Sequence, residues 1–386
     1  MLPTRDLDYE LPEHCIALAP APRREDARLM VVRASDPSLI EHAQVKDLPR
    51  YLRANDLLVL NATRVLPARL EGVRIDTGGA VQGLYLSPAQ IPGVQRTWSV
   101  LLSGKRLREN GVVGLHDHSG NDSGVRLRLL SHAAGDLASQ HGAWLVSVED
   151  ANGQAIQESD TAILDRVGLT ALPPYIRAAR KRVQVATDEA TDRERYQTTY
   201  AKDTATGGSV AAPTAGLHLT PDLLASLAAM GVRRAEVVLH VGLGTFANVE
   251  TEFIEQHPMH HEWCEMTKDV MDAITHTRES LAEQRGRVFA VGTTAARTIE
   301  SFAARNEPGQ ISTNILITPG YQWRWVDGLL TNFHLPRSTL MAMVASLLQR
   351  GSPEHSGVTR LKNLYETAVR EGYRFYSFGD AMLILP

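Results

Sequence analysis

The chain has 386 residues, of which 43% are hydrophobic and 22% are charged, and its formal net charge is −4. These values are ordinary for a soluble globular protein, and they exclude a disordered chain, a collagen and a coiled coil as the main state. The most apolar run, residues 340–348, is too short to span a bilayer, and the N-terminal segment lacks the apolar core of a signal peptide. The length suggests two domains, or one large domain that carries an insertion.

Cysteine content and charge indicate the cellular compartment and limit the possible binding partners. The two cysteines, Cys15 and Cys264, are too few for a disulfide framework, so we expect a protein of the reducing cytoplasm. Lysine and arginine together number 40 against 44 aspartates and glutamates. A protein that binds nucleic acid over its whole surface would be more basic, so any contact with phosphate requires a local basic patch.

The sequence pattern changes between residues 66 and 150. Before it, residues 57–60 form an apolar run that predicts a buried strand. Six short stretches with turn signals between them then predict a small antiparallel barrel or sandwich. These stretches are residues 70–75, 80–86, 98–102, 112–116, 125–130 and 143–148.

From about residue 160 the pattern alternates between helix and strand, which is typical of an α/β layer architecture. We expect helices over residues 221–230, 267–284, 294–304 and 338–348, and strands over residues 235–241, 288–291 and 315–317. Residues 176–194 are rich in charge and poor in large apolar groups, so we expect a mobile loop there. The fold class is therefore α/β, with a larger mixed domain (residues 1–65 and 151–386) and an inserted antiparallel barrel (residues 66–150).

Two loops rich in small residues are candidates for ligand binding. The first, residues 207–218, contains Pro213, Thr214, Gly216 and His218, and its small side chains let a ligand approach backbone N–H groups closely. The second follows a predicted strand and contains His240, Gly242, Gly244 and Thr245. Ligands of open α/β sheets bind beyond the carboxyl ends of strands, but this loop is not a dinucleotide fingerprint. A structural loop remains an equally good reading of the first segment.

A cluster of histidines follows at His257, His260 and His261, with Glu262 beside them. It lacks the spacing of the two-histidine zinc helix, and Pro258 prevents a simple helical face. We therefore expect no metal here, and favour proton transfer or substrate contact by these side chains.

Three further segments carry polar groups at the ends of predicted elements. Thr293 or Thr294 is expected to cap a helix whose first N–H groups form an anion site, with Arg297 one turn further on. Asn332 and His334 lie in an apolar neighbourhood, and Asp380 is either a turn residue or a ligand carboxylate. A basic run and a second basic cluster could contact phosphates, although most such runs are only solvated; they are Arg177, Arg180, Lys181 and Arg182, with Lys105 and Arg106.

Taken together and in this order, these motifs resemble one family, the S-adenosylmethionine:tRNA ribosyltransferase-isomerases of queuosine biosynthesis. The resemblance runs over nearly the whole chain. Its most specific parts are residues 63–69, 172–176, 195–198, 209–218, 239–246, 257–260, 292–297, 331–336 and 379–384. It implies a larger α/β domain with an inserted β-barrel, and the pattern of short stretches in residues 66–150 predicts the same insertion.

The resemblance also implies an activity. S-adenosylmethionine acts as a ribosyl donor, and the acceptor is 7-aminomethyl-7-deazaguanine at the wobble position of a tRNA with a GUN anticodon. A base removes a proton beside the sulfonium to give an ylide, adenine leaves, and the sugar rearranges to an epoxide with loss of methionine. The aminomethyl nitrogen then attacks the sugar, so the products are epoxyqueuosine-tRNA, adenine and methionine. We expect a cytoplasmic monomer with no prosthetic group, and S-adenosylmethionine as co-substrate.

The resemblance and the motifs together give a set of expected site residues. The expected catalytic residues are His218, His240, His257 and His260. The expected substrate-binding residues are Arg64, Tyr196, Pro213, Thr214, Gly216, Gly242, Gly244, Thr245, Thr293, Thr294, Arg297, Asn332, His334 and Asp380. The sequence leaves open which of the four histidines is the general base.

The chain departs from the usual family pattern at a few positions. Ala62 stands where an acidic residue usually precedes Thr63, and Gln82 replaces an acidic residue early in the barrel. Two alternatives therefore stay open. One is a divergent relative that binds tRNA or S-adenosylmethionine with an altered acceptor or without catalysis. The other is a methyltransferase, against which stands the lack of a glycine-rich loop after an early strand.

Overall fold

The computed structural model describes residues 1–133, 142–185, 188–203, 208–241, 249–280, 285–350 and 356–386. The strands of the larger part are β1 (Arg28–Arg33), β2 (Asp36–Gln44), β3 (Leu57–Asn61), β10 (Arg233–Leu239), β11 (Glu262–Met266), β12 (Val288–Val291), β13 (Gly309–Thr313), β14 (Gly328–Asn332) and β15 (Ala381–Leu385). Its helices are α2 (Pro174–Arg182), α3 (Glu189–Arg195), α4 (Pro221–Ala229), α5 (Lys268–Glu279), α6 (Thr293–Arg305), α7 (Thr339–Leu348) and α8 (Ser356–Arg370), whereas α1 (Asp160–Val167) packs in the hydrophobic cluster of the inserted barrel.

The described strands of this part form one mixed sheet in the order β13-β11-β10-β3-β12-β14-β15-β1-β2. Strands β10, β3, β12 and β14 run parallel to one another in its centre. Along β3, Leu57 and Val59 face one hydrophobic cluster, whereas Leu58 and Leu60 face another. This alternation buries both faces of the strand, which explains why its sequence is continuously apolar.

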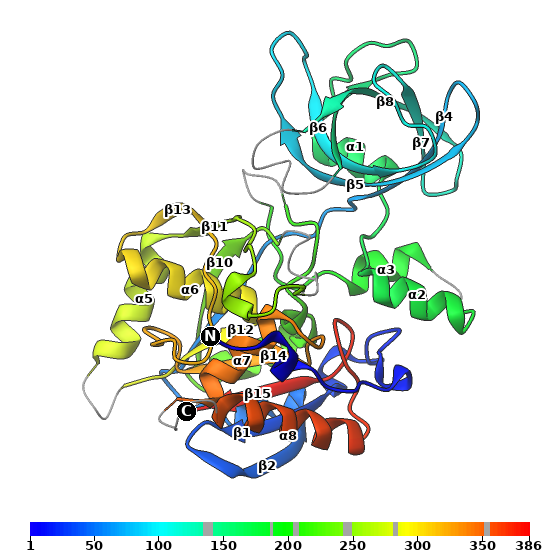
Figure 1. Cartoon of the computed structure of the whole chain (residues 1–386). Coiled ribbons are helices and arrows are strands. Elements are labelled where there is room, and N and C mark those ends of the chain that lie inside the picture. The colour runs from blue at the N-terminus through cyan, green and yellow to red at the C-terminus, as the bar shows by residue number, and fades with distance from the viewer. Residues whose placement is uncertain (134–141, 186–187, 204–207, 242–248, 281–284, 351–355) are drawn as a thin grey trace.

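Helices cover both faces of the sheet (Figure 1). Residues of α5, α6, α7 and α8 contribute to the cluster on one face, and residues of α4 contribute to the cluster on the other. Side chains cap two of these helices: the Thr220 hydroxyl accepts a hydrogen bond from the Leu223 amide at 3.3 Å, and the Ser338 hydroxyl accepts one from the Met341 amide at 3.3 Å.

A closed antiparallel barrel is inserted between β3 and α1 (Figure 1). Its strands follow the order β4-β5-β6-β9-β8-β7 around a core that contains Trp98 and Trp144. Five of the six predicted stretches lie within one of these strands and the first, residues 70–75, ends one residue beyond β4, so the expected barrel is confirmed. The strands are β4 (Arg69–Arg74), β5 (Ala80–Ala89), β6 (Thr97–Ser103), β7 (Val112–His116), β8 (Asp122–His132) and β9 (Ala143–Glu149).

Two expectations were wrong. Residues 315–317 are not a strand: Ile317 is buried against the helices, and the apolar run packs without entering the sheet. Residues 176–194, expected to be a mobile loop, include most of α2 and α3. Their charges are partly neutralised internally, because Arg180 forms a two-pronged ion pair with Asp192 at 2.6 and 2.8 Å inside this helix pair.

Within the described residues, no helix is long and apolar enough to cross a membrane. Cys15 and Cys264 are both buried and unpaired.

Candidate functional site

A cavity of about 530 Å³, part of it open to solvent, lies at the carboxyl edge of the sheet. The central strands are parallel, so the segments that follow β10, β12 and β14 meet at this edge. Six of the expected site residues therefore come together at this cavity from distant parts of the chain. The lining includes Pro213, Thr214, Thr293, Thr294, Asn332 and His334.

Asn332, at the end of β14, holds two walls of this cavity together. Its side chain is 3% exposed, accepts a hydrogen bond from the Thr214 hydroxyl at 2.9 Å and donates one to the Tyr376 carbonyl at 3.2 Å. The amide oxygen accepts from one wall and the amide nitrogen donates to the other, so the position of Thr214 depends on Asn332.

The first turn of α6 opens into the same cavity. The residue that precedes the helix is Gly292, at φ 90° and ψ 156°, a conformation that essentially only glycine adopts. No side chain caps this end of the helix, so the expectation of a threonine cap was wrong. The Thr294 hydroxyl is instead buried without a hydrogen-bond partner among the described residues. A free hydroxyl and a helix N-terminus together offer donors to a ligand atom that carries negative charge.

His334 lines the cavity but is held by protein groups. Its Nε2 lies 2.8 Å from the Thr331 hydroxyl, and its backbone N–H donates to the Tyr365 hydroxyl at 2.9 Å. Burial lowers the pKa of this imidazole to about 3. The ring is therefore neutral at physiological pH, which suits a hydrogen-bonding role better than proton uptake.

His240 follows β10, directly before Val241 of the cavity lining. Its Nδ1 lies 3.3 Å from the Thr63 hydroxyl, and its ring stacks on Trp263 with centroids 4.9 Å apart. Burial lowers the pKa of His240, which favours the neutral form that can accept a proton.

A second recess adjoins the cavity, because Leu340 lines both. His257, His260, Glu262 and Arg297 line this recess. Burial, with a smaller effect of His260, lowers the pKa of His257. The structure thus brings two of the expected catalytic histidines close to Arg297.

Four expected residues lie elsewhere. His218 is buried, and its two ring nitrogens contact the carbonyl oxygens of Ala215 and Gly379 at 3.1 and 2.9 Å. Gly216 provides close packing, because a Cβ there would lie 1.9 Å from the Tyr200 hydroxyl. The carboxylate of Asp380 accepts hydrogen bonds from Arg28 and Arg374. Tyr196 packs edge-on against Phe378. His218, Gly216 and Asp380 thus have structural tasks, and Tyr196 does not line the cavity, so we leave all four out of the proposed site.

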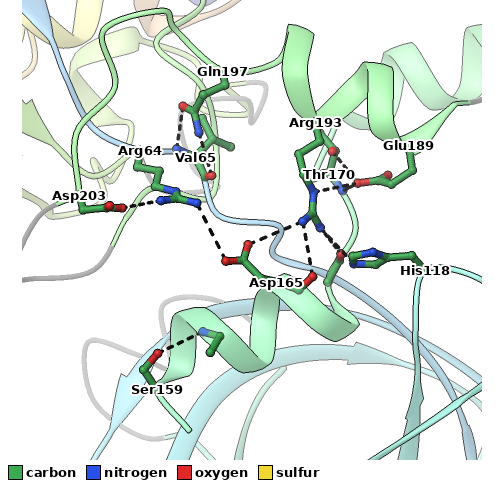
Figure 2. A network of polar contacts seen from close by, with 12 residues as sticks. Arg64, Val65, His118, Ser159, Asp165, Thr170, Glu189, Arg193, Gln197 and Asp203 are labelled. Carbon is green, nitrogen blue, oxygen red and sulfur yellow. Dashed lines mark hydrogen bonds and ion pairs between the residues drawn. The ribbon is translucent and has the colours of Figure 1, made fainter.

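Arg64 lies in a polar network between the barrel and the larger part (Figure 2). It contacts Asp203 at 2.7 Å and Asp165 at 4.0 Å. Arg193 of α3 contacts the same Asp165 and reaches His118 of the barrel at 3.1 Å. The network connects α1, α3 and the barrel, so Arg64 lies at the junction of the two parts and does not line the cavity.

The candidate tRNA contacts fall into two groups. Lys105 and Arg106 are exposed on the turn between β6 and β7, and Arg177, Lys181 and Arg182 are exposed on α2. Arg180 is removed from this set, because its side chain is buried with Asp192 and also donates to the Leu18 carbonyl. Arg182 is paired with Glu13.

Some site features were not expected from the sequence. Tyr175 and Ser377 line the cavity and share a hydrogen bond of 2.6 Å, and Tyr376 lies beside them. Only the fold shows that the turn around Tyr376 reaches the cavity. Gly242, Gly244 and Thr245 lie outside the described residues.

The structure shows the environment of Ala62 and Gln82, the two residues that depart from the family pattern. Ala62 is buried in the hydrophobic cluster with Leu60, and its backbone pairs with Val237 and Lys202. Gln82 is exposed on β5, opposite Glu71. Neither side chain lines the cavity. Among the described residues there is also no group of three or more side chains that could hold a metal ion.

These features define an α/β protein with an inserted barrel and a ligand cavity at the carboxyl edge of its sheet. Residues 4–384 match the family described as queuosine biosynthesis protein. A relative from Gloeobacter violaceus, named S-adenosylmethionine:tRNA ribosyltransferase-isomerase, is 44% identical over 99% of this chain and 96% of its own length. One of the same name from Desulfitobacterium hafniense is 42% identical, over 98% and 99% respectively.

A crystal structure of S-adenosylmethionine tRNA ribosyltransferase from Thermotoga maritima is similar as well. It has a TM-score of 0.50 and 28% identity, and the match covers 98% of this chain and all of that one. The chain belongs to the queuosine biosynthesis protein family.

Proposed function

We propose that this chain is an S-adenosylmethionine:tRNA ribosyltransferase-isomerase and that the cavity at the sheet edge binds S-adenosylmethionine. The single observation that carries the choice of site is the convergence of Thr214, Thr294 and Asn332 on one cavity. Hydroxyl and amide groups suit a ribose, and the flanking Tyr175 and Tyr376 rings suit a purine.

The first turn of α6 provides a reason for adenine to leave. When the bond between sugar and base breaks, negative charge develops on the purine. The N-terminus of α6 and the free Thr294 hydroxyl stabilise such charge, because both present hydrogen-bond donors in a buried place. This contribution is greater for the departing base than for the neutral one, so it lowers the barrier and not only the binding constant.

The proton beside the sulfonium needs a base. Of the four expected catalytic histidines, His240, His257 and His260 are the remaining candidates, since both ring nitrogens of His218 contact backbone carbonyl groups. His240 and His257 are both biased towards the neutral form by burial, which lowers the pKa of each. A neutral imidazole accepts the proton and then holds it as a cation until the sugar has rearranged.

The reaction can be tested by its products. The protein is incubated with S-adenosylmethionine and a GUN-anticodon tRNA that carries 7-aminomethyl-7-deazaguanine at the wobble position. Adenine and methionine are expected in equal amounts, with a tRNA that carries ordinary guanine there as the control. Formation of S-adenosylhomocysteine would identify a methyltransferase instead, and tRNA binding without either product would identify a relative without catalysis.

The exposed cations on the barrel turn and on α2 provide a tRNA surface in this proposal. Neutralising Lys105, Arg106, Arg177 and Lys181 with glutamine should weaken tRNA binding most at low salt. Each lost phosphate contact should lower the slope of log K against log salt by about 0.7–0.9. Titrations at several salt concentrations measure that slope.

The matched control replaces Arg5 and Lys268, which are equally exposed but lie far from α2 in the chain, on an N-terminal turn and on α5. Their neutralisation should leave the slope within error of the unmodified protein. An unchanged slope in the first variant as well would show that the basic residues of α2 and the barrel are only solvated. The expected monomer and its cytoplasmic setting belong to the same proposal, and gel filtration with light scattering tests the former.

A further inference from the structure

Arg297 is the most unusual charged residue of the recess beside the cavity. It lies on α6, its side chain is 3% exposed, and its Nη1 is ion-paired with Glu262, which is equally buried. Its Nε and Nη2 have no hydrogen-bond partner among the described residues. A buried guanidinium with unused donors is costly, so such an arrangement indicates a missing partner.

Other arginines of the chain that pair with a buried carboxylate show what a purely structural role looks like: Arg180 is itself buried and Arg287 is half-buried. Arg287 donates from Nε and Nη2 to the carboxylate of Asp56 and from Nη2 to the Tyr51 carbonyl. In Arg180, Nε, Nη1 and Nη2 are all bonded. Only one nitrogen of Arg297 is bonded in the described structure, so its ion pair with Glu262 does not account for the whole side chain.

The unused nitrogens have a definite geometry. Nε and Nη2 lie on one edge of a guanidinium, and that edge binds a carboxylate through two parallel hydrogen bonds. Glu262 occupies the Nη1 end, which leaves this edge for a second carboxylate. A single anionic group would leave the recess with excess negative charge beside Glu262, so a group that also carries a cation fits better.

The recess lies next to the cavity, along the same helix. Thr293 and Arg297 are four residues apart on α6 and therefore lie on the same face of the helix. Leu340 lines both the cavity and the recess. A ligand whose nucleoside part occupies the cavity can thus extend along α6 to the ion pair.

We propose that Arg297 and Glu262 form the subsite for the α-amino acid end of S-adenosylmethionine. The carboxylate of the methionyl group accepts hydrogen bonds from Nε and Nη2 of Arg297, and its ammonium group donates to Glu262. The zwitterion adds no net charge and supplies the missing partner of the guanidinium. The assignment rests on the proposed function, and it makes Arg297 a substrate-binding residue that selects the donor by its tail.

The test compares two sulfonium ligands that differ only in the carboxylate. Binding of S-adenosylmethionine and of decarboxylated S-adenosylmethionine is measured by calorimetry without tRNA, so that no turnover occurs. We expect the unmodified protein to bind the complete ligand about 10- to 150-fold more tightly, the range for a hydrogen bond to a charged group. In Arg297→Gln this preference should fall to about 1. Arg297→Lys should keep part of it, because the charge remains but the two-pronged edge is lost.

The matched control is Arg287→Gln. It removes the half-buried arginine that pairs with the buried Asp56, directly before β12 and away from both the cavity and the recess. It should reduce stability and leave the preference for the carboxylate unchanged. The comparison of ligands on the unmodified protein needs no variant, so a poorly folded Arg297→Gln does not weaken the test.

The outcomes separate the two proposals. Equal binding of both ligands by the unmodified protein would overturn the assignment of the subsite while leaving the proposed function intact. A preference that persists in Arg297→Gln would overturn the role of Arg297. If neither sulfonium binds, the proposed function fails, and the subsite fails with it.

Discussion

Replacing Asn332 with alanine is expected to lower kcat/KM for S-adenosylmethionine by about 5- to 150-fold. The change leaves the Thr214 hydroxyl without its acceptor and the Tyr376 carbonyl without its donor, at 2.9 and 3.2 Å in the folded protein. An orphaned buried polar group costs about 1–3 kcal/mol, and here both orphans belong to the walls of the cavity. Initial rates of adenine release over a range of S-adenosylmethionine concentrations provide the measurement.

A control separates this effect from a general loss of stability. Ser301→Ala on α6 also removes a buried hydrogen bond, of 2.6 Å to Thr313, but neither residue lines the cavity. It should reduce stability and keep kcat/KM nearly unchanged. Thr214→Val should act non-additively with Asn332→Ala, because both changes remove the same contact. Additive losses, or a normal kcat/KM in Asn332→Ala, would contradict the role given to this pair.

The fold was predictable where local patterns and burial agree. Each barrel stretch has its own turn signals, and Leu57–Asn61 is apolar on both faces because both faces are covered. The run at residues 315–317 has the same composition, yet it packs on the core without pairing. Composition reports burial, whereas pairing depends on whether a neighbouring strand is available, and that is set by the rest of the fold.

The helix pair α2 and α3 shows a different limit. Its residues are strongly charged, and a solvated loop is the usual meaning of such a run. In the structure Arg180 and Asp192 neutralise each other between the two helices. Partners twelve positions apart and on different elements leave no periodic signal in one sequence, so their pairing emerges only from the tertiary structure.

The candidate site was partly predictable for a topological reason. The segments after β10 and β12 were identified as polar segments that follow predicted strands, and the segment around Asn332 as polar groups in an apolar neighbourhood. Parallel strands bring all three segments to one edge. What the sequence did not reveal is which way each side chain points. His218 and His334 both lie in candidate segments, but the ring nitrogens of the first contact backbone carbonyl groups, whereas the second lines the cavity. That distinction depends on packing around each ring.

His334 also gives the chain a sensitivity to acid. Its side chain is 8% exposed, and burial lowers the pKa from an ordinary 6.5 to about 3 in the folded protein. As pH falls below 6.5, the unfolded chain takes up a proton at this residue and the folded chain does not. The preference of the folded state for the neutral imidazole therefore contributes its full share of stability above pH 6.5, and this share is lost progressively as pH falls from 6.5 towards 3. Between pH 7 and pH 5 the loss should be about 2 kcal/mol of the free energy of unfolding. His218, His240 and His257, whose pKa values are also lowered by burial, act in the same direction.

Denaturant unfolding of His334→Gln at the two pH values isolates this residue from the carboxylates, which also respond to acid. The glutamine keeps a hydrogen-bonding group for Thr331 and cannot titrate, so the variant is less stable at pH 7 but should lose about 2 kcal/mol less than the unmodified protein on going to pH 5. His14→Gln removes an exposed histidine and is the matched control, with an expected pH dependence like that of the unmodified protein. If His334→Gln keeps the full pH dependence, the imidazole must be able to take up a proton in the folded state. It would then join His240, His257 and His260 as a candidate for the base, because a ring that titrates inside the cavity can accept a proton from the substrate.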